Sequence, residues 1–284
     1  MQKISQSFLS FILICLFQPA GTFVASANDE LTAEEKRAAI VLANAFMKQW
    51  EETGDMKQLV ESFYAPDFIE CFVEREKRNL AQKGDPAKTR EFAFGLAYQP
   101  ALLETAARED WQRLYVAMME LTFCLMTHYL NQQAGAMLHG KELEFESEKM
   151  MRSFERMLSP EVRKELLQHR ILKSYFSDDD DALPAIQTVE EMREIAIVLE
   201  KTTASMKKTV GSNAYQPTLV ARRLATKLRM GLQPNQVSDG RVEYGLKMPR
   251  DAKVIYMPTM LMHFLVIAKV EGHYKVYWAE VISA

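Results

Sequence analysis

The chain has 284 residues, of which 35 are Lys or Arg and 38 are Asp or Glu, so its formal net charge is −3 at neutral pH. This balance argues against an electrostatic nucleic-acid binder, because such proteins concentrate basic residues into a strongly positive surface. A hydrophobic fraction of 48% is ordinary for a globular protein, and the length is sufficient for a substantial buried core.

The first 27 residues have the pattern of a cleaved export signal. Lys3 supplies a positive charge, residues 8–17 (FLSFILICLF) form an apolar run, and residues 25–27 (Ala-Ser-Ala) match the pattern that signal peptidase cleaves. A helix needs about 20 apolar residues to cross a bilayer, so this shorter run predicts cleavage and a mature protein that begins at Asn28. The alternative is a lipid anchor on Cys15, but the small residue expected before a lipoprotein cysteine is missing.

No later apolar run approaches membrane length, so we predict a soluble protein with no stable membrane span after processing. An export signal also predicts a periplasmic or extracellular location.

The mature chain is predicted to open with three helices, because apolar residues recur at helical spacing between clear start and stop signals. The signals are a capping-box pair (Thr32, Glu35), helix ends at Gly54 and Pro66, a cap at Asp55, and apolar runs that reach Trp50, Phe63 and Leu80.

The middle of the chain, over about 87–230, is predicted to be helical as well. Its clearest run has apolar residues every three or four positions from Trp111 to Tyr129. Further helices are expected over Phe145–Met157, after Ser159-Pro160, over Met192–Met206 behind a second capping box, and over Pro217–Arg229.

From Gly240 the apolar period changes from that of helices to that of strands. Strands are expected over Val242–Leu246, Val254–Tyr256, Met260–Val270 and His273–Ile282, with a turn at Glu271-Gly272. We therefore predict an α+β fold over 28–284, a mostly helical body with a small C-terminal antiparallel sheet over about 240–283. So small a sheet needs a helical cover, which the first helices can supply.

The segment Phe46–Asp55, with Phe63-Tyr64 and Ala65–Phe68 behind it, resembles the opening of nuclear transport factor two-like proteins. The closing hairpin, with Gly272 at its turn and Trp278 beyond, is similar to the final strands of that family. The resemblance covers about the first 45 and the last 45 mature residues, and the long helical middle departs from the family. It implies a cone-shaped pocket between sheet and helices, in a fold class that hosts both enzymes and binding modules.

Common catalytic motifs are absent from the sequence: it lacks H-E-x-x-H, C-x-x-C, G-x-S-x-G, the P-loop and G-x-G-x-x-G. Ser205 and Lys208 match the S-x-x-K pattern of penicillin-recognising enzymes, but the accompanying S-D-N and K-T-G elements are missing. The acidic run Asp178–Asp181 lacks the ligand spacing of a calcium loop. We therefore predict no metal and no cofactor.

His263 is the leading candidate for a functional residue, because it lies in an apolar run where burial would shift its pKa. On strand alternation it shares a face with Leu265 and Ile267, and it could act as a general base or ligand donor beside Tyr256 or Tyr277. A histidine hydrogen-bonded within the core remains the alternative. His128, on the aromatic stripe of the long helix, is a second candidate with the same two interpretations.

Cys71 and Cys124 remain after processing, and export would allow them to form a disulfide. Both lie in apolar helical patterns, so we favour two buried thiols. The functional expectation is a non-catalytic module that binds a small apolar ligand or a protein partner between sheet and helices. The alternatives are an enzyme that uses His263 in acid–base chemistry and a structural component of the cell envelope.

Overall fold

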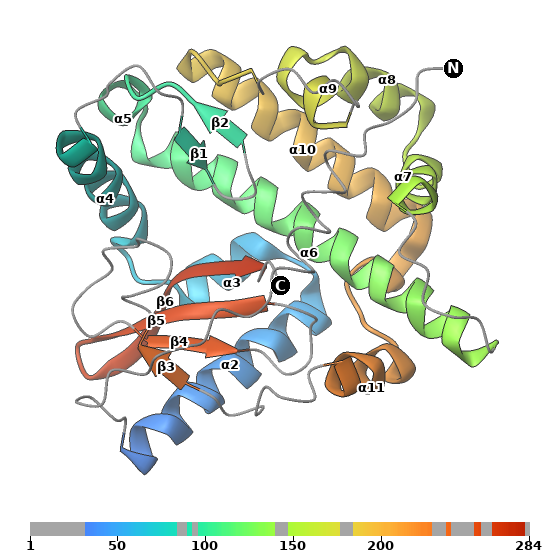
Figure 1. Cartoon of the computed structure of the whole chain (residues 1–284), viewed down its shortest axis with the longest axis horizontal. Coiled ribbons are helices and arrows are strands. Elements are labelled where there is room, and N and C mark those ends of the chain that lie inside the picture. Colours follow the sequence, from blue (N-terminus) through green and yellow to red (C-terminus); the bar gives the residue numbers. More distant parts are fainter. Residues whose placement is uncertain are drawn as a thin grey trace.

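The computed structural model in Figure 1 describes residues 32–83, 90–92, 96–139, 147–176, 184–228, 237–239, 253–256 and 263–281. Within these ranges a helical body carries a four-stranded antiparallel sheet formed by the last strands, which confirms the predicted α+β class. The predicted export signal, the acidic run at 178–181 and the predicted strand at 242–246 lie outside the described residues.

The helices occupy most of the described chain. They are α2 (Ala33–Thr53), α3 (Met56–Phe63), α4 (Phe68–Lys83), α5 (Leu102–Thr105), α6 (Arg108–Leu138), α7 (Ser147–Arg156), α8 (Pro160–Gln168), α9 (Arg170–Phe176), α10 (Val189–Val210), the 3₁₀ turn η2 (Gly211–Ala214) and α11 (Leu219–Leu228). The strands are β1 (Arg90–Phe92), β2 (Leu96–Tyr98), β3 (Val237–Asp239), β4 (Lys253–Tyr256), β5 (His263–Val270) and β6 (His273–Val281).

The helix caps predicted at the start of the helical region are present in the structure. The Thr32 hydroxyl accepts a hydrogen bond from the Glu35 backbone N–H at 3.2 Å, and the Glu35 carboxylate accepts one from the Thr32 N–H at 2.9 Å. Gly54 adopts the left-handed conformation, with φ 59°, and its N–H donates to the Trp50 carbonyl at 2.7 Å. This conformation favours glycine, so Gly54 ends α2 and allows Asp55 to cap α3.

The large sheet has the order β3-β4-β5-β6, and the N-terminal helices lie beside it in Figure 1. The backbone N–H of Ala65, between α3 and α4, donates to the carbonyl of Val276 on β6 at 2.8 Å. This bond joins two segments more than 200 residues apart at the edge of the sheet, and α2 also contacts β4 and β6.

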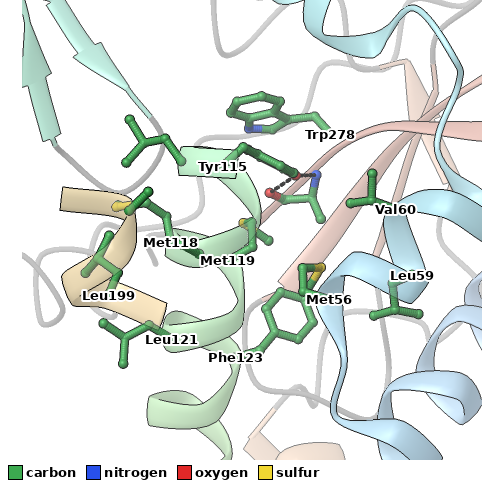
Figure 2. Packing of buried hydrophobic residues seen from close by; sticks show 14 of the residues in the cluster. Met56, Leu59, Val60, Tyr115, Met118, Met119, Leu121, Phe123, Leu199 and Trp278 are labelled. Carbon is green, nitrogen blue, oxygen red and sulfur yellow. Dashed lines mark hydrogen bonds between the residues drawn. The ribbon is translucent and has the colours of Figure 1, made fainter. Parts of the chain in front are cut away.

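In Figure 1 the long helix α6 lies between the sheet with α2 and α3 on one side and α10 on the other. Towards the sheet, the Tyr115 hydroxyl pairs with that of Tyr64 at 2.9 Å and accepts the Ala279 N–H of β6 at 3.0 Å. Figure 2 shows Tyr115 next to Trp278 on this side, while Leu199 of α10 packs near Met118 and Leu121. Burial among these side chains raises the pKa of Tyr64 well above its usual value. One hydrophobic core therefore joins both halves of the described chain.

A short hairpin, β1–β2, interrupts the region that was predicted to be helical, so the prediction is wrong there. Backbone bonds outside the hairpin hold β2: Ile186 donates its N–H to Ala97 and accepts from Gln99, both at 2.8 Å. The pairing that forms β2 therefore depends on a segment far away in the sequence, which the local pattern does not reveal.

Candidate functional site

A groove lies between the N-terminal half of α2 and the tip of the β5–β6 hairpin. Its volume is about 580 Å³, which is within the range of about 300–1,000 Å³ usual for small-molecule sites. It is the best candidate for a binding site that the described residues provide, because it combines an apolar wall with a charged rim.

The apolar wall is a stripe of small and branched side chains along α2, formed by Ala38, Val41, Leu42 and Ala45. Their spacing of three, four and seven residues places them on one face of the helix, next to the face that enters the core. Val41 is 66% exposed, although an apolar side chain of this size is usually buried. We call these four residues the α2 stripe.

The opposite wall comes from the hairpin, whose two-residue turn has positive φ at both Glu271 (50°) and Gly272 (83°). Such a turn matches the twist of the strands and keeps the hairpin tight. It places Lys269, His273 and Tyr274 along the groove.

One ion pair joins the two walls. Lys269 Nζ lies 3.5 Å from the Glu35 carboxylate, and the same Nζ lies 5.8 Å from the centre of the Tyr274 ring. The hydrogen bond from the Thr32 N–H is the main cause that lowers the pKa of Glu35, with a smaller contribution from Lys269. Glu35 therefore stays ionised at neutral pH while it caps α2 and holds the hairpin.

The groove is suited to binding. The α2 stripe offers apolar contact, and Lys269, His273 and Tyr274 offer hydrogen-bond donors to a polar end of a ligand. Among the described residues, no group of three or more His, Cys, Asp or Glu side chains could hold a metal ion.

Two of the predicted site residues, His263 and Tyr256, are placed by the backbone alone. His263 pairs with Val281 at the start of β5, and Tyr256 pairs with Phe264 at the end of β4. Their side chains lie outside what the structure describes, so the proposed roles of both residues stay predictions.

Tyr277 is buried, and it contacts the start of α4 rather than the groove. The register of β5 and β6 shifts between Val266 and Ile267, which leaves Tyr277 as the extra residue of a β-bulge. Its hydroxyl donates to the Asp67 carboxylate at 3.2 Å. The bulge interrupts the strand alternation, so Tyr277 and Trp278 both contact the α4 segment.

His128 lies on α6 in a polar cluster with Ser153 of α7 and Gln132. Its Nε2 is 3.2 Å from the Ser153 hydroxyl and 2.8 Å from the Gln132 amide nitrogen, which also donates to the Ser153 hydroxyl. Burial lowers the pKa of His128, which favours its neutral form. The Gln132 amide nitrogen is bonded to both His128 and Ser153. The cluster is therefore a polar contact between α6 and α7.

The two cysteines are separate. Cys124 is buried in α6, and burial raises the pKa of its thiol to about 12. Cys71 is half-buried on α4, with its sulfur 3.5 Å from the Asp67 carboxylate. The structure does not join these two cysteines by a disulfide, and the raised pKa leaves Cys124 a poor nucleophile.

The S-x-x-K match is explained by a structural role. The Ser205 hydroxyl accepts a hydrogen bond from the Ser159 N–H at 2.8 Å, at the start of α8. It therefore helps to join α8 to α10, while Lys208 is exposed.

The sequence interpretation missed the α2 stripe. The apolar residues of the first helix up to Trp50 were treated as one run, which combines the buried Ala39 and Phe46 with the neighbouring stripe. A second set of apolar residues at spacing 38, 41, 42 and 45 is the signal that would have found it.

Comparisons with known protein families, curated proteins and solved structures found no match to this chain. The resemblance to nuclear transport factor two-like proteins therefore stays a prediction.

Proposed function

We propose that the protein is an exported, non-catalytic binding module that holds a small, largely apolar molecule in the groove between α2 and the β5–β6 hairpin. The observation that carries this proposal is the α2 stripe: apolar residues at helical spacing form a wall of a groove of about 580 Å³. An apolar ligand would remove this surface from water, which is the main driving force for binding such molecules.

The polar rim favours an amphiphilic ligand. Lys269, His273 and Tyr274 lie on the hairpin side of the groove, so a polar end of the ligand would meet hydrogen-bond donors there. The apolar body would then contact Val41 and its neighbours. A purely structural envelope component would have no need of such a groove.

The test uses the uncharged fluorescent probe N-phenyl-1-naphthylamine and the purified protein. Replacing Val41 by Asp places a carboxylate in the apolar wall and should weaken probe binding about tenfold or more, since burial of one branched apolar side chain contributes about 1.5–3 kcal/mol. The matched control is Leu219→Asp on α11, because Leu219 is 65% exposed and Val41 is 66% exposed. The control should bind the probe within about twofold of the unmodified protein.

Equal loss in both variants, or no loss in Val41→Asp, would contradict the groove as the site. The enzyme alternative has its own variant: His263→Gln should leave probe binding within a few fold if the protein only binds. An enzyme that used His263 would lose about 10²–10⁴ in turnover on its substrate. Mass spectrometry of small molecules extracted from the purified protein identifies the natural ligand.

Export is the second part of the proposal, and it rests on the sequence of residues 1–27. N-terminal sequencing of protein recovered from outside the cytoplasm should begin at Asn28. Intact protein with Met1 in the cytoplasm would contradict export and would leave the groove unaffected. Among the described residues, no helix has the length and apolar character needed to cross a membrane.

A further inference from the structure

The groove between α2 and the β5–β6 hairpin has its charged groups at one end. Glu34 and Glu35 lie in the first turn of α2, and Lys269 contacts Glu35 from the hairpin. The α2 stripe begins one turn further along the helix, at Ala38, and ends at Ala45. This stretch corresponds to about 10 Å along the helix axis. A ligand that follows the groove therefore has its polar end beside Lys269 and its apolar part along α2.

Glu35, the partner of Lys269, is also held by other hydrogen bonds. Oε2 of Glu35 accepts a hydrogen bond from the Thr32 N–H at 2.9 Å and another from the Thr32 hydroxyl at 3.0 Å. The ion pair between Lys269 Nζ and Glu35 Oε1 is longer, at 3.5 Å, and its side chains are 46% and 31% exposed. Exposed ion pairs contribute little stability. Glu35 can therefore remain the cap of α2 while Lys269 binds a different carboxylate.

Among the described residues that line the groove, Lys269 is the only Lys or Arg. Its position follows from the strand register: Lys269 lies opposite Tyr274 on β6, and its Nζ is 5.8 Å from the centre of that ring. Cation–π attraction favours an ammonium in this place. His273 and the Tyr274 hydroxyl add hydrogen-bond donors on the same wall. The hairpin wall therefore presents a positive charge and further donors to the groove.

We propose that the ligand of the groove is a single-chain monocarboxylate of the fatty-acid type, whose carboxylate replaces Glu35 as the partner of Lys269. This proposal rests on the function proposed above, and it adds the charge and shape of the ligand. The hydrocarbon chain lies along the α2 stripe. Glu34 and Glu35 also line the groove, so a head with one negative charge is repelled less than a phosphate dianion. A cationic head would lie beside the Lys269 ammonium, and the Glu35 carboxylate that could attract it is already bonded to Thr32.

Decanoate, decylamine and decanol have the same straight chain and differ in the charge of the head, so together they test the proposal by isothermal titration calorimetry. The unmodified protein should bind decanoate about fivefold or more tightly than decylamine, because the two heads carry opposite charges at neutral pH. Nonanoate should bind about fourfold more weakly than decanoate, since it buries one methylene less.

Two substitutions at the ion pair should have opposite effects on decanoate. Lys269→Met removes the ammonium and keeps a long side chain, so it should weaken decanoate binding about fivefold or more. Glu35→Gln removes the competing carboxylate, so it should tighten decanoate binding about two- to fivefold, which matches the strength of an exposed ion pair. Glutamine also serves in a capping box, so α2 should keep its cap. Decanol binding should change by no more than about twofold in either variant.

The matched control is Lys275→Met on the same hairpin. Lys275 follows Tyr274 on β6 and therefore faces the other side of the sheet, where its Nζ donates to the Ser62 carbonyl at 3.3 Å. This variant should bind decanoate within about twofold of the unmodified protein. Lys269→Arg keeps the positive charge, so it should retain decanoate binding within about threefold.

The results separate this proposal from the function proposed for the groove. If decanol and N-phenyl-1-naphthylamine bind but Lys269→Met leaves decanoate binding unchanged, the groove is retained and the carboxylate ligand is wrong. If none of these molecules binds the unmodified protein, both proposals fail. Decylamine that binds more tightly than decanoate, or Glu35→Gln that does not tighten decanoate binding, would also overturn the exchange of partners at Lys269.

Discussion

Gly54 offers the sharpest test of how the first two helices are joined, because two separate effects oppose a side chain at this position. The φ of 59° is a left-handed conformation, which costs an L-residue about 1 kcal/mol or more. A Cβ atom built on Gly54 would also lie 2.6 Å from Cγ and 2.8 Å from both Cδ atoms of the Tyr215 ring.

The ring cannot move without loss of other contacts. It packs against Trp50, with ring centres 6.3 Å apart, and Lys207 Nζ lies 5.8 Å from its centre. Forcing such a shift typically costs about 1–3 kcal/mol, so Gly54→Ala should lower the free energy of unfolding by about 2–4 kcal/mol in total. For a chain of this size, the unfolding temperature should fall by roughly 5–15 °C.

A double-mutant cycle separates the two effects by urea or thermal unfolding. In a Tyr215→Ala background the ring is absent, so Gly54→Ala should cost only the backbone term of about 1 kcal/mol. Gly135→Ala is the control: a Cβ added to this α6 residue would meet no atom within 4 Å beyond the backbone of its own helix, and alanine should stabilise the helix by about 1 kcal/mol there. Equal costs of Gly54→Ala in both backgrounds would refute the role assigned to Tyr215.

Two further predictions concern pH and the hairpin. Burial lowers the pKa of His128, so the unfolded chain binds a proton at a higher pH than the folded one does. The free energy of unfolding should therefore be highest above the ordinary histidine pKa of about 6.5, and it should fall as the pH drops through the folded pKa. Denaturation curves at about pH 7.5 and 5 measure this fall. The fall should be smaller in His128→Gln. Glu271 has φ 50° in the hairpin turn, where Asn is preferred. Glu271→Asn should therefore raise the free energy of unfolding by about 0.5–1 kcal/mol. A decrease would contradict the turn assignment.

Local signals predicted the helices well. The capping pair Thr32 and Glu35, the glycine at position 54 and Pro160 at the first turn of α8 act through their own neighbours, so the sequence alone places them. Strands β1, β2 and β3 have three residues each: β1 pairs with β2, β3 pairs with β4, and β2 is also held by the distant residue Ile186. A three-residue run carries too little periodicity to be recognised without that pairing.

The predicted face of His263 shows where strand alternation fails. Residues 265–268 are all buried, so both faces of β5 are covered over this stretch and alternation does not mark a single apolar face. On the partner strand β6, the bulge at Tyr277 also breaks the alternation of side chains between the two faces. The groove was beyond sequence reasoning for a related reason, since its walls come from α2 and from a hairpin more than 220 residues later in the chain.

Strand β6 borders the groove at one end, and its backbone is held further along. Tyr274 borders the groove and Trp278 lies near Arg75, while the Val276 carbonyl between them accepts the Ala65 N–H at 2.8 Å. The Ala279 N–H is bound to Tyr115 as well. These bonds fix the strand between the groove and Arg75, and the effects of substitutions at separated positions generally add. Arg75→Lys should therefore leave probe binding in the groove within about twofold of that of the unmodified protein, and a larger loss would contradict a strand that is held at these points.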